Sequence, residues 1–224
     1  MDEAGTKPTP ERRAPLVVAV TGGIGAGKSA FCEYLARKPG ARCLSADREA
    51  HALLERDPAV VDAVAEAFGA RVRDSRGGID RGRLAEVVFA EPDRLRILEG
   101  ILHPRVRARL AAQVARLKAD PATAIVLVEI PLLLEAGVPD WCDWVLALEA
   151  PRAARLARLA ARGLAPEEAR RRMALQAEDA ARAVIADERI VNDGDRAALE
   201  RRADRWWRGR GKAQERAWTR RSRD

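Results

Sequence analysis

The chain of 224 residues, 47% of them hydrophobic, is long enough for one α/β domain with an insertion or for two small domains. It has no run of about 18 apolar residues, which argues against a membrane-spanning helix, and polar residues 1–15 lack the apolar segment of a secretory signal and are expected to be a disordered leader. Three widely spaced cysteines and two histidines favour reduced thiols in a cytoplasmic protein over a disulfide framework or a zinc site. The net charge of +7 raises the question of an acidic partner.

A glycine-rich octapeptide, G-G-I-G-A-G-K-S, occupies residues 22–29. It follows an apolar run at 16–21 that predicts a β-strand, and it opens a segment at 29–36 that predicts a helix. It fits the phosphate-binding pattern G-x-x-x-x-G-K-[ST] in the strand–loop–helix setting that this pattern requires. A flexible glycine-rich turn is the alternative, but the flanking elements favour a site for a nucleoside triphosphate.

The residue types of this loop suit an anionic ligand. Gly22, Gly25 and Gly27 allow positive φ angles and a close approach of backbone N–H groups to phosphate oxygens. Lys28 supplies a point charge for the β- and γ-phosphates, and the hydroxyl of Ser29 can complete the coordination shell of Mg²⁺. The loop therefore predicts ATP with Mg²⁺ as the bound nucleotide and metal.

Asp47 follows a short predicted strand at 41–45, close to the phosphate loop in a fold of this kind. A carboxylate there could accept a proton from an attacking hydroxyl, orient that hydroxyl, or hold Mg²⁺ through water. The simpler alternative is a helix N-cap, since a helical segment follows at once.

A long helical region follows the second strand. Asp57, before a proline, and Asp80 are expected to be N-cap residues. Pro104 predicts a kink or break in the helix at 92–118. The predicted helices span residues 48–56, 58–68, 81–89 and 92–118.

Further strands are predicted at 124–130, 144–148 and 189–191. The first two are continuously apolar, which is typical of strands buried on both faces of a parallel sheet. Strands alternating with helices indicate an α/β fold with a doubly wound parallel sheet. The remaining helices are predicted at 151–162, at 166–186 and from Asp195 to about Arg208.

Ligands of such sheets bind at the carboxyl ends of the strands, where the phosphate loop, Asp47, Glu129 and Glu135 all fall. Glu129 stands near the end of a buried strand, in the position of the acid that supports Mg²⁺ in phosphate-loop proteins. Because a buried carboxylate without compensation is costly, we expect Mg²⁺ or an arginine as its partner.

Arginines are dense late in the chain. On a mobile lid they would neutralise the charge of a transferred phosphoryl group and exclude water, but a solvated helical face is an equal alternative. The absence of an N-K-x-D signature argues against a GTPase, so a small-molecule kinase is favoured. These arginines are Arg155, Arg158, Arg162, Arg170, Arg171, Arg172 and Arg182.

The excess positive charge lies wholly in residues 196–224, which hold 11 basic and 4 acidic residues. With Trp206, Trp207 and Trp218, this end could bind RNA or an acidic partner. The alternative is a last helix that docks Trp206 or Trp207 on the core and then frays into a basic tail at 209–224. We favour the second interpretation, so nucleic acid is not expected as the partner.

Nine short motifs together give the chain a resemblance to the dephospho-CoA kinase family over about residues 16–200. The order and spacing of the motifs make the resemblance specific, whereas the loop alone would fit many nucleotide-binding proteins. They are T-G-G-I-G-A-G-K-S at 21–29, S-A-D at 45–47, F-G at 68–69, G-I-D-R-x-x-L at 78–84, V-F at 88–89, L-H-P at 102–104, P-L-L-L-E at 131–135, R-M-x-x-Q at 172–176 and A-D-x-x-I-x-N-x-G at 186–194.

The resemblance implies transfer of the γ-phosphoryl group of ATP to the ribose 3′-hydroxyl of dephospho-CoA, the last step of coenzyme A synthesis. It implies a sheet of the P-loop NTPase type, with residues 16–208 as the kinase core, 57–118 as a helical CoA-binding insertion and 152–186 as the lid. The expected partners are ATP and dephospho-CoA, without a membrane. Another small-molecule kinase, of the nucleoside monophosphate or shikimate type, is the nearest rival.

The resemblance also assigns site residues by position in the motifs. Asp47 is the proposed base, and Lys28 and Arg158 act with it in catalysis. ATP would be bound by Gly22, Gly23, Gly25, Ala26, Gly27, Lys28, Ser29, Ala30, Arg162 and Asn192, with Ser29 also on the metal. The acceptor would be bound or its site supported by Thr21, Asp47, His103, Pro104, Arg107, Leu132, Leu133 and Glu135.

Three positions depart from the family pattern. Ser45 stands where the family usually has Asp, His51 where it commonly has Arg, and Glu129 where Asp is often found. Ser45 can still accept or donate a hydrogen bond, and Glu129 keeps a carboxylate. His51 and His103 are not expected to transfer protons, while His103 could bind the acceptor or satisfy a backbone group beside Pro104.

Overall fold

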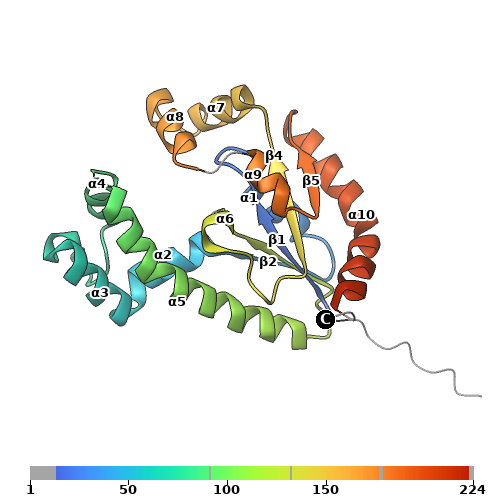
Figure 1. Ribbon diagram of the computed structural model, residues 1–224, viewed down its shortest axis with the longest axis horizontal. Helices are drawn as coiled ribbons and strands as arrows, with labels where there is room; N and C mark the ends of the chain where they lie inside the picture. Colours follow the sequence, from blue (N-terminus) through green and yellow to red (C-terminus); the bar gives the residue numbers. More distant parts are fainter. Residues whose placement is uncertain (1–13, 91, 132, 177–178, 222–224) are drawn as a thin grey trace, which may run out of the picture.

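Five parallel strands form one sheet in the computed structural model, which describes residues 14–90, 92–131, 133–176 and 179–221 (Figure 1). The strand order is β2-β3-β1-β4-β5, so the first strand lies in the middle and the chain winds outward in both directions. This is the doubly wound α/β sheet predicted from the sequence. The strands are β1 (Leu16–Thr21), β2 (Ala41–Ser45), β3 (Ile125–Glu129), β4 (Trp144–Glu149) and β5 (Glu188–Val191).

The central strands are buried on both faces, which explains their continuous apolar sequence. Successive side chains of β1 point to opposite faces. Val17 and Ala19 join one hydrophobic cluster, with helices from the middle of the chain, whereas Val18 and Val20 join the other, with the first and last helices. Both clusters form because helices cover both faces of the sheet.

Helices connect the strands, because two parallel neighbours need a crossover connection and cannot be joined by a tight hairpin. Those of the first half are α1 (Lys28–Leu35), α2 (Ala46–Arg56), α3 (Pro58–Phe68), the 3-10 turn η1 (Ala70–Val72), α4 (Arg81–Ala90) and α5 (Pro92–Ala119). Those of the second half are α6 (Leu133–Ala136), α7 (Arg152–Ala160), α8 (Pro166–Ala174), α9 (Asp179–Ile185) and α10 (Arg196–Arg221).

The helices α2 to α5 lie together between β2 and β3 and extend to one side of the sheet (Figure 1). The N-caps predicted at Asp57 and Asp80 are present, since their carboxylates accept hydrogen bonds from Val60 N (3.3 Å) and Gly82 N (2.9 Å). The predicted break at Pro104 is wrong: α5 runs through it as one helix. Packing of α5 against α2, α3 and α4 stabilises the continuous helix despite the missing proline N–H.

The last helix is longer than its sequence predicts. It continues past Arg208 to Arg221 as α10, so the frayed tail expected from about residue 209 is replaced by helix as far as the structure describes it. Ala213 and Ala217 are buried in the cluster that holds Trp206, whose ring meets Phe31 edge-on at 5.9 Å. This packing outweighs the low helix propensity of two glycines in the second half, about 1 kcal/mol each.

Cys32, Cys43 and Cys142 carry free thiols, as expected for reduced cysteines. Among the described residues, no helix combines the length and the apolar character needed to cross a membrane.

Candidate active site

The phosphate-binding loop joins β1 to α1 at the carboxyl end of the central strand. Gly22, Gly25 and Gly27 have φ angles of 144°, 78° and 102°, in the region that favours glycine. Gly22 also lies against the backbone of β4, because a Cβ atom there would stand 2.2 Å from the carbonyl oxygen of Leu148. The conformation predicted for these three glycines is therefore confirmed.

Lys28 is folded into this loop. Its side chain is only 7% exposed, and its Nζ donates to the carbonyl oxygens of Gly22 (2.8 Å) and Gly23 (3.3 Å). Burial lowers the pKa of Lys28, while the negative charges of Glu129 and Asp47 act in the opposite direction. A largely desolvated ammonium group next to two carboxylates is placed where it can exchange its carbonyl partners for phosphate oxygens.

Ser29 and Glu129 form a polar pair beside Lys28. The hydroxyl of Ser29 donates to Oε1 of Glu129 at 2.8 Å, and Glu129 is buried at the end of β3. The compensation expected for this buried carboxylate is thus a hydroxyl and a nearby ammonium group. Thr21 ends β1 next to the loop, and its buried hydroxyl has no partner among the residues that the structure describes.

Asp47 is the second residue of α2 and not its N-cap. Ser45 holds the cap position, where its hydroxyl accepts a hydrogen bond from Arg48 N at 3.4 Å. The capping interpretation of Asp47 is therefore wrong, and its exposed carboxylate is left for another role. Ser45, which replaces the usual family Asp, has the structural task of starting this helix.

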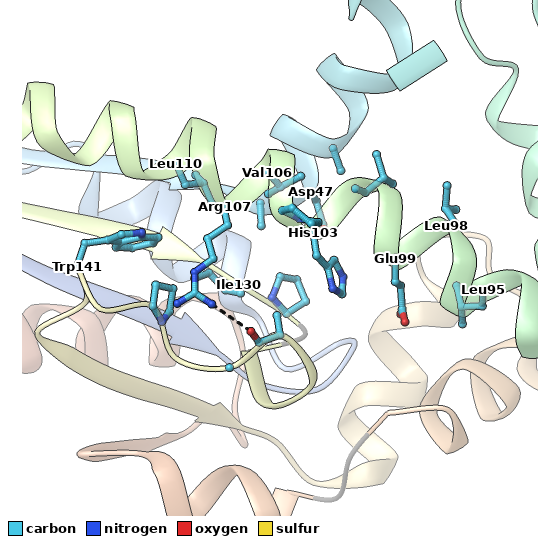
Figure 2. Close-up of a pocket in the computed structure, with 18 residues that line it drawn as sticks. Asp47, Leu95, Leu98, Glu99, His103, Val106, Arg107, Leu110, Ile130 and Trp141 are labelled. Atoms are coloured by element: carbon cyan, nitrogen blue, oxygen red, sulfur yellow. Dashed lines mark hydrogen bonds between the residues drawn. The ribbon is translucent and has the colours of Figure 1, made fainter. Parts of the chain in front are cut away.

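A cavity of about 530 Å³ opens next to Asp47 (Figure 2). It lies between α2, α5 and the segment that follows β3, and most of its wall is apolar. Asp47, His103, Pro104 and Arg107, four residues predicted to bind the acceptor, line it. Arg107 reaches across it to the carbonyl oxygen of Ala136 at 3.4 Å.

Other residues predicted for the acceptor lie elsewhere. Leu133 is fully buried in the core and does not line the cavity, so it can only support the wall from behind. Leu132 lies outside the described residues, as does the side chain of Glu135. The apolar wall formed by Leu95, Leu98 and Trp141 was not predicted, since apolar side chains on a helix pattern cannot be told from core residues by sequence.

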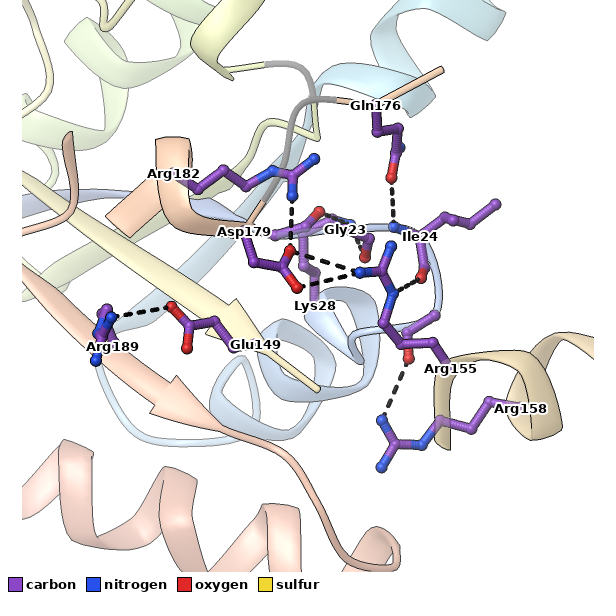
Figure 3. Close-up of polar contacts among 12 residues, drawn as sticks. Gly23, Ile24, Lys28, Glu149, Arg155, Arg158, Gln176, Asp179, Arg182 and Arg189 are labelled. Atoms are coloured by element: carbon purple, nitrogen blue, oxygen red, sulfur yellow. Dashed lines mark hydrogen bonds and ion pairs between the residues drawn. The ribbon is translucent and has the colours of Figure 1, made fainter. Parts of the chain in front are cut away.

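Arg155 of α7 lies directly on the phosphate loop (Figure 3). Its Nε donates to the carbonyl oxygen of Ile24 at 2.8 Å, and its guanidinium also pairs with Asp179 at 3.2 Å. Gln176 approaches the same point, because its Oε1 accepts the N–H of Ile24 at 2.7 Å. The arginine-rich segment therefore folds back over the loop instead of forming a wholly solvated face.

Arg158 and Asn192 bind the far side of the loop. Arg158 donates to the carbonyl oxygens of Gly25 (3.2 Å), Asn192 (3.0 Å) and Gly194 (2.8 Å). The side-chain amide of Asn192 donates to Ala26 O at 2.8 Å. Both residues thus shape the loop, whatever they add to nucleotide binding.

Two other predicted nucleotide residues make no comparable contact. Arg162 lies beyond the end of α7 with an exposed side chain, and Ala30 is half-buried in the first turns of α1. The sequence marked Arg155 and Arg182 only as members of an arginine-rich segment. Arg155 and Arg182 are more than 100 residues away from the loop along the chain, so the sequence could not show that this segment lies beside it.

Known proteins resemble the chain over most of its length. A family model described as dephospho-CoA kinase matches residues 16–198. The chain belongs to the dephospho-CoA kinase family. A dephospho-CoA kinase from Methylococcus capsulatus is 42% identical over 190 residues, covering 84% of this chain and 93% of the relative. One from Streptomyces avermitilis is 40% identical over 193 residues, with 86% and 92% covered.

Solved structures agree with this membership. The Thermus thermophilus protein TT1252 superposes with a TM-score of 0.72 and 30% identity, covering 88% of this chain and 98% of that protein. A dephospho-CoA kinase from Campylobacter jejuni gives a TM-score of 0.63 and 28% identity, with 86% and 95% covered. The predictions of a P-loop sheet and of the dephospho-CoA kinase family are therefore confirmed, and the rival kinase families are set aside.

Proposed function

We infer that the chain catalyses the ATP-dependent phosphorylation of the ribose 3′-hydroxyl of dephospho-CoA, which yields coenzyme A. Membership of the dephospho-CoA kinase family identifies the reaction. The observation that connects it to this site is the position of Asp47, which lines the acceptor cavity and also acts electrostatically on Lys28 in the phosphate loop. Donor and acceptor sites therefore meet at one carboxylate.

In the proposed reaction the 3′-oxygen attacks the γ-phosphorus of ATP. A bond forms between these atoms, the bond from the γ-phosphorus to the bridging oxygen breaks, and ADP leaves with that oxygen. Asp47 accepts the hydroxyl proton, a role supported by its exposure and by the absence of a capping task. Lys28 and Arg158, with the other arginines at the loop, offset the charge on the transferred group.

The acceptor would lie in the cavity beside Asp47. Its apolar wall suits the uncharged, partly apolar arm of dephospho-CoA, while His103 and Arg107 offer polar contacts at the same surface. Residues 57–118, which supply most of the α5 wall, would form the CoA-binding insertion. Residues 152–186 would form the lid, with Arg162 at its exposed end.

Mg²⁺ is part of this proposal. The hydroxyl of Ser29 and the carboxylate of Glu129 form an oxygen pair next to the loop, which is the donor type that Mg²⁺ prefers. Ser29 would bind the ion directly and Glu129 through water. Bound there, Mg²⁺ would neutralise charge on the β- and γ-phosphates.

A coupled assay of ADP release with Mg·ATP, run with and without dephospho-CoA, tests the function. We expect release to depend strongly on dephospho-CoA and the product to gain the mass of one phosphoryl group. Release that is equally fast without the acceptor, or no release, would contradict the proposal. Adenosine and shikimate serve as control acceptors and should not be phosphorylated.

A further inference from the structure

One carboxylate joins two buried arginines above the phosphate loop. Asp179, at the start of α9, pairs with Arg155 of α7 at 3.2 Å and with Arg182 of its own helix at 2.8 Å (Figure 3). The side chains of Arg155 and Arg182 are only 8% and 3% exposed, whereas that of Asp179 is 38% exposed. A shared acid between two desolvated guanidinium groups is a demanding arrangement, because each cation needs a compensating charge.

Arg182 still has an unused donor. Its Nη2 is buried and makes no hydrogen bond to any residue in the described part of the chain. A buried guanidinium nitrogen without a partner is costly, so the site is incomplete without an acceptor. Figure 3 shows the Arg182 side chain at the phosphate loop with Lys28, whose pKa is lowered mainly by burial and further by the positive charge of Arg182. An anion on the loop would supply the missing acceptor.

Arg155 is held just as closely. A Cβ atom on Gly23 would lie 2.3 Å from its Nη2, so the guanidinium rests on the loop backbone itself. It is fixed from both sides, by Ile24 O through Nε and by Asp179 through Nη1. The loop can therefore have no side chain at residue 23 while Arg155 keeps this position.

Without Asp179, three cations would face one another in a poorly solvated space: Lys28, Arg155 and Arg182. Like charges at such sites repel strongly, and long side chains would turn toward water. The carboxylate prevents this and fixes two planar groups before any phosphate arrives. Groups fixed in advance contribute more to a transition state than groups that must be ordered during the reaction.

We propose that Asp179 is a positioning residue for phosphoryl transfer, which holds Arg155 and Arg182 over the loop so that both guanidinium groups face the terminal phosphates of the bound nucleotide. The proposal rests on the proposed kinase function and adds to it the residue that organises the cations. Asp179 itself touches neither substrate.

The test compares two carboxylates that each bridge two arginines. In Asp179→Asn the shape is kept and the charge is lost, and we expect kcat to fall about 10-fold while KM for ATP changes less than about 3-fold. In the matched control Glu168→Gln, the lost carboxylate pairs with the exposed side chains of Arg171 and Arg172 within α8, and kcat should be unchanged. Asp179→Glu keeps the charge and should retain most of the activity.

A double-mutant cycle shows whether Asp179 acts through Arg182. If it does, the loss caused by Asp179→Asn should be smaller in the Arg182→Gln background than in the wild type, because only its effect through Arg155 remains. Additive losses, equal effects of Asp179→Asn and Glu168→Gln, or a loss in Asp179→Glu as large as in the Asn variant would each overturn the proposal. Thermal unfolding of every variant identifies losses that come from misfolding.

The wild-type rate separates the two hypotheses. If the wild-type protein does not phosphorylate dephospho-CoA, the proposed function fails. Asp179 is then judged by calorimetric binding of a non-hydrolysable ATP analogue to the wild type, the two single variants and the double variant. A smaller loss of affinity from Asp179→Asn in the Arg182→Gln background than in the wild type would support an action through Arg182, and equal losses in the two backgrounds would refute it.

Discussion

Two regions of this molecule are rich in arginine, and the fold uses them in opposite ways. In α7 to α9 the side chains of Arg155 and Arg182 turn inward, lose nearly all contact with water and pair with Asp179 (Figure 3). In α10 the basic side chains of Arg201, Arg205 and Arg208 are exposed to solvent.

The difference lies in what each helix packs against. Helices α7 to α9 meet the phosphate loop, where loop carbonyls and one acid accept guanidinium donors. The buried face of α10 consists instead of alanines, a leucine and Trp206, so Arg201, Arg205 and Arg208 remain exposed on its other faces. Composition alone does not distinguish a cation that meets substrate from one that keeps the surface soluble; burial and partners do.

The most deeply embedded cation should show the largest effect. Lys28→Ala removes the ammonium group from the loop, and we expect phosphoryl transfer to fall about 10³-fold, as for the loss of a fixed charge-stabilising donor. Because burial disfavours the charged form of this lysine, its removal should not lower the melting temperature. Steady-state assays and thermal unfolding of the same preparation check both. A rate near the wild-type value would refute the phosphate-loop assignment.

Asp47 should show the next largest effect. Asp47→Asn keeps the size of the side chain but cannot accept the hydroxyl proton, and kcat should fall about 10²-fold with little change in ATP affinity. Since Ser45 caps α2, stability should be nearly unchanged. Single-turnover rates measure the effect on the chemical step, and calorimetry measures the affinity for ATP. An unchanged kcat would show that Asp47 is not the base.

For α10 the comparison predicts an effect on folding and not on chemistry. Trp206→Ala removes a buried ring that meets Phe31 and whose Nε1 donates to Glu188 at 3.0 Å. We expect a loss of about 3–5 kcal/mol in the free energy of unfolding, measured in urea, with kcat per folded molecule unchanged. A marked fall in kcat at full folding would mean that α10 acts on the site.

The attachment of α10 to α1 should also weaken in acid. Lys38 and Tyr34 hold the carboxylate of Asp204 at 2.6 and 2.8 Å, and these hydrogen bonds lower the pKa of Asp204 below its ordinary 3.8. A lowered pKa stabilises the fold above the unfolded value, and that contribution is lost as the pH falls through the folded one. Melting temperatures below about pH 4 should fall less with pH in Asp204→Asn than in wild type. Parallel curves would contradict this.

The smallest effect is expected for the exposed cations of α10. Arg201, Arg205 and Arg208 are exposed, and replacing all three with Gln should change kcat less than about 2-fold. Fluorescence anisotropy with a short RNA tests the nucleic-acid alternative in the same variant. This is cleaner than deleting residues from 209 onward, because Ala213 and Ala217 are part of the core. A larger loss of kcat would mean that the exposed arginines of α10 also act on the reaction.

Several local features could be predicted because they depend on neighbours in the chain. The φ angles of Gly22, Gly25 and Gly27 follow from a short pattern, and Asp57 and Asp80 cap the helices that they precede. The break at Pro104 and the end of α10 at about Arg208 were wrong for the opposite reason. In both places contacts with distant elements outweighed a local preference of proline or glycine.

The sequence by itself determined the strands, the doubly wound parallel type of the sheet, the phosphate loop and the family, since each is encoded in short apolar runs, in the alternation of strands with helices or in motifs. Only the tertiary structure decided that Ser45 caps α2 and leaves Asp47 open, that apolar side chains form a cavity beside Asp47, and that Asp179 pairs with two arginines. These features join residues far apart in the chain. Their energies come from burial and from paired charges, which exist only once the helices have packed on the sheet.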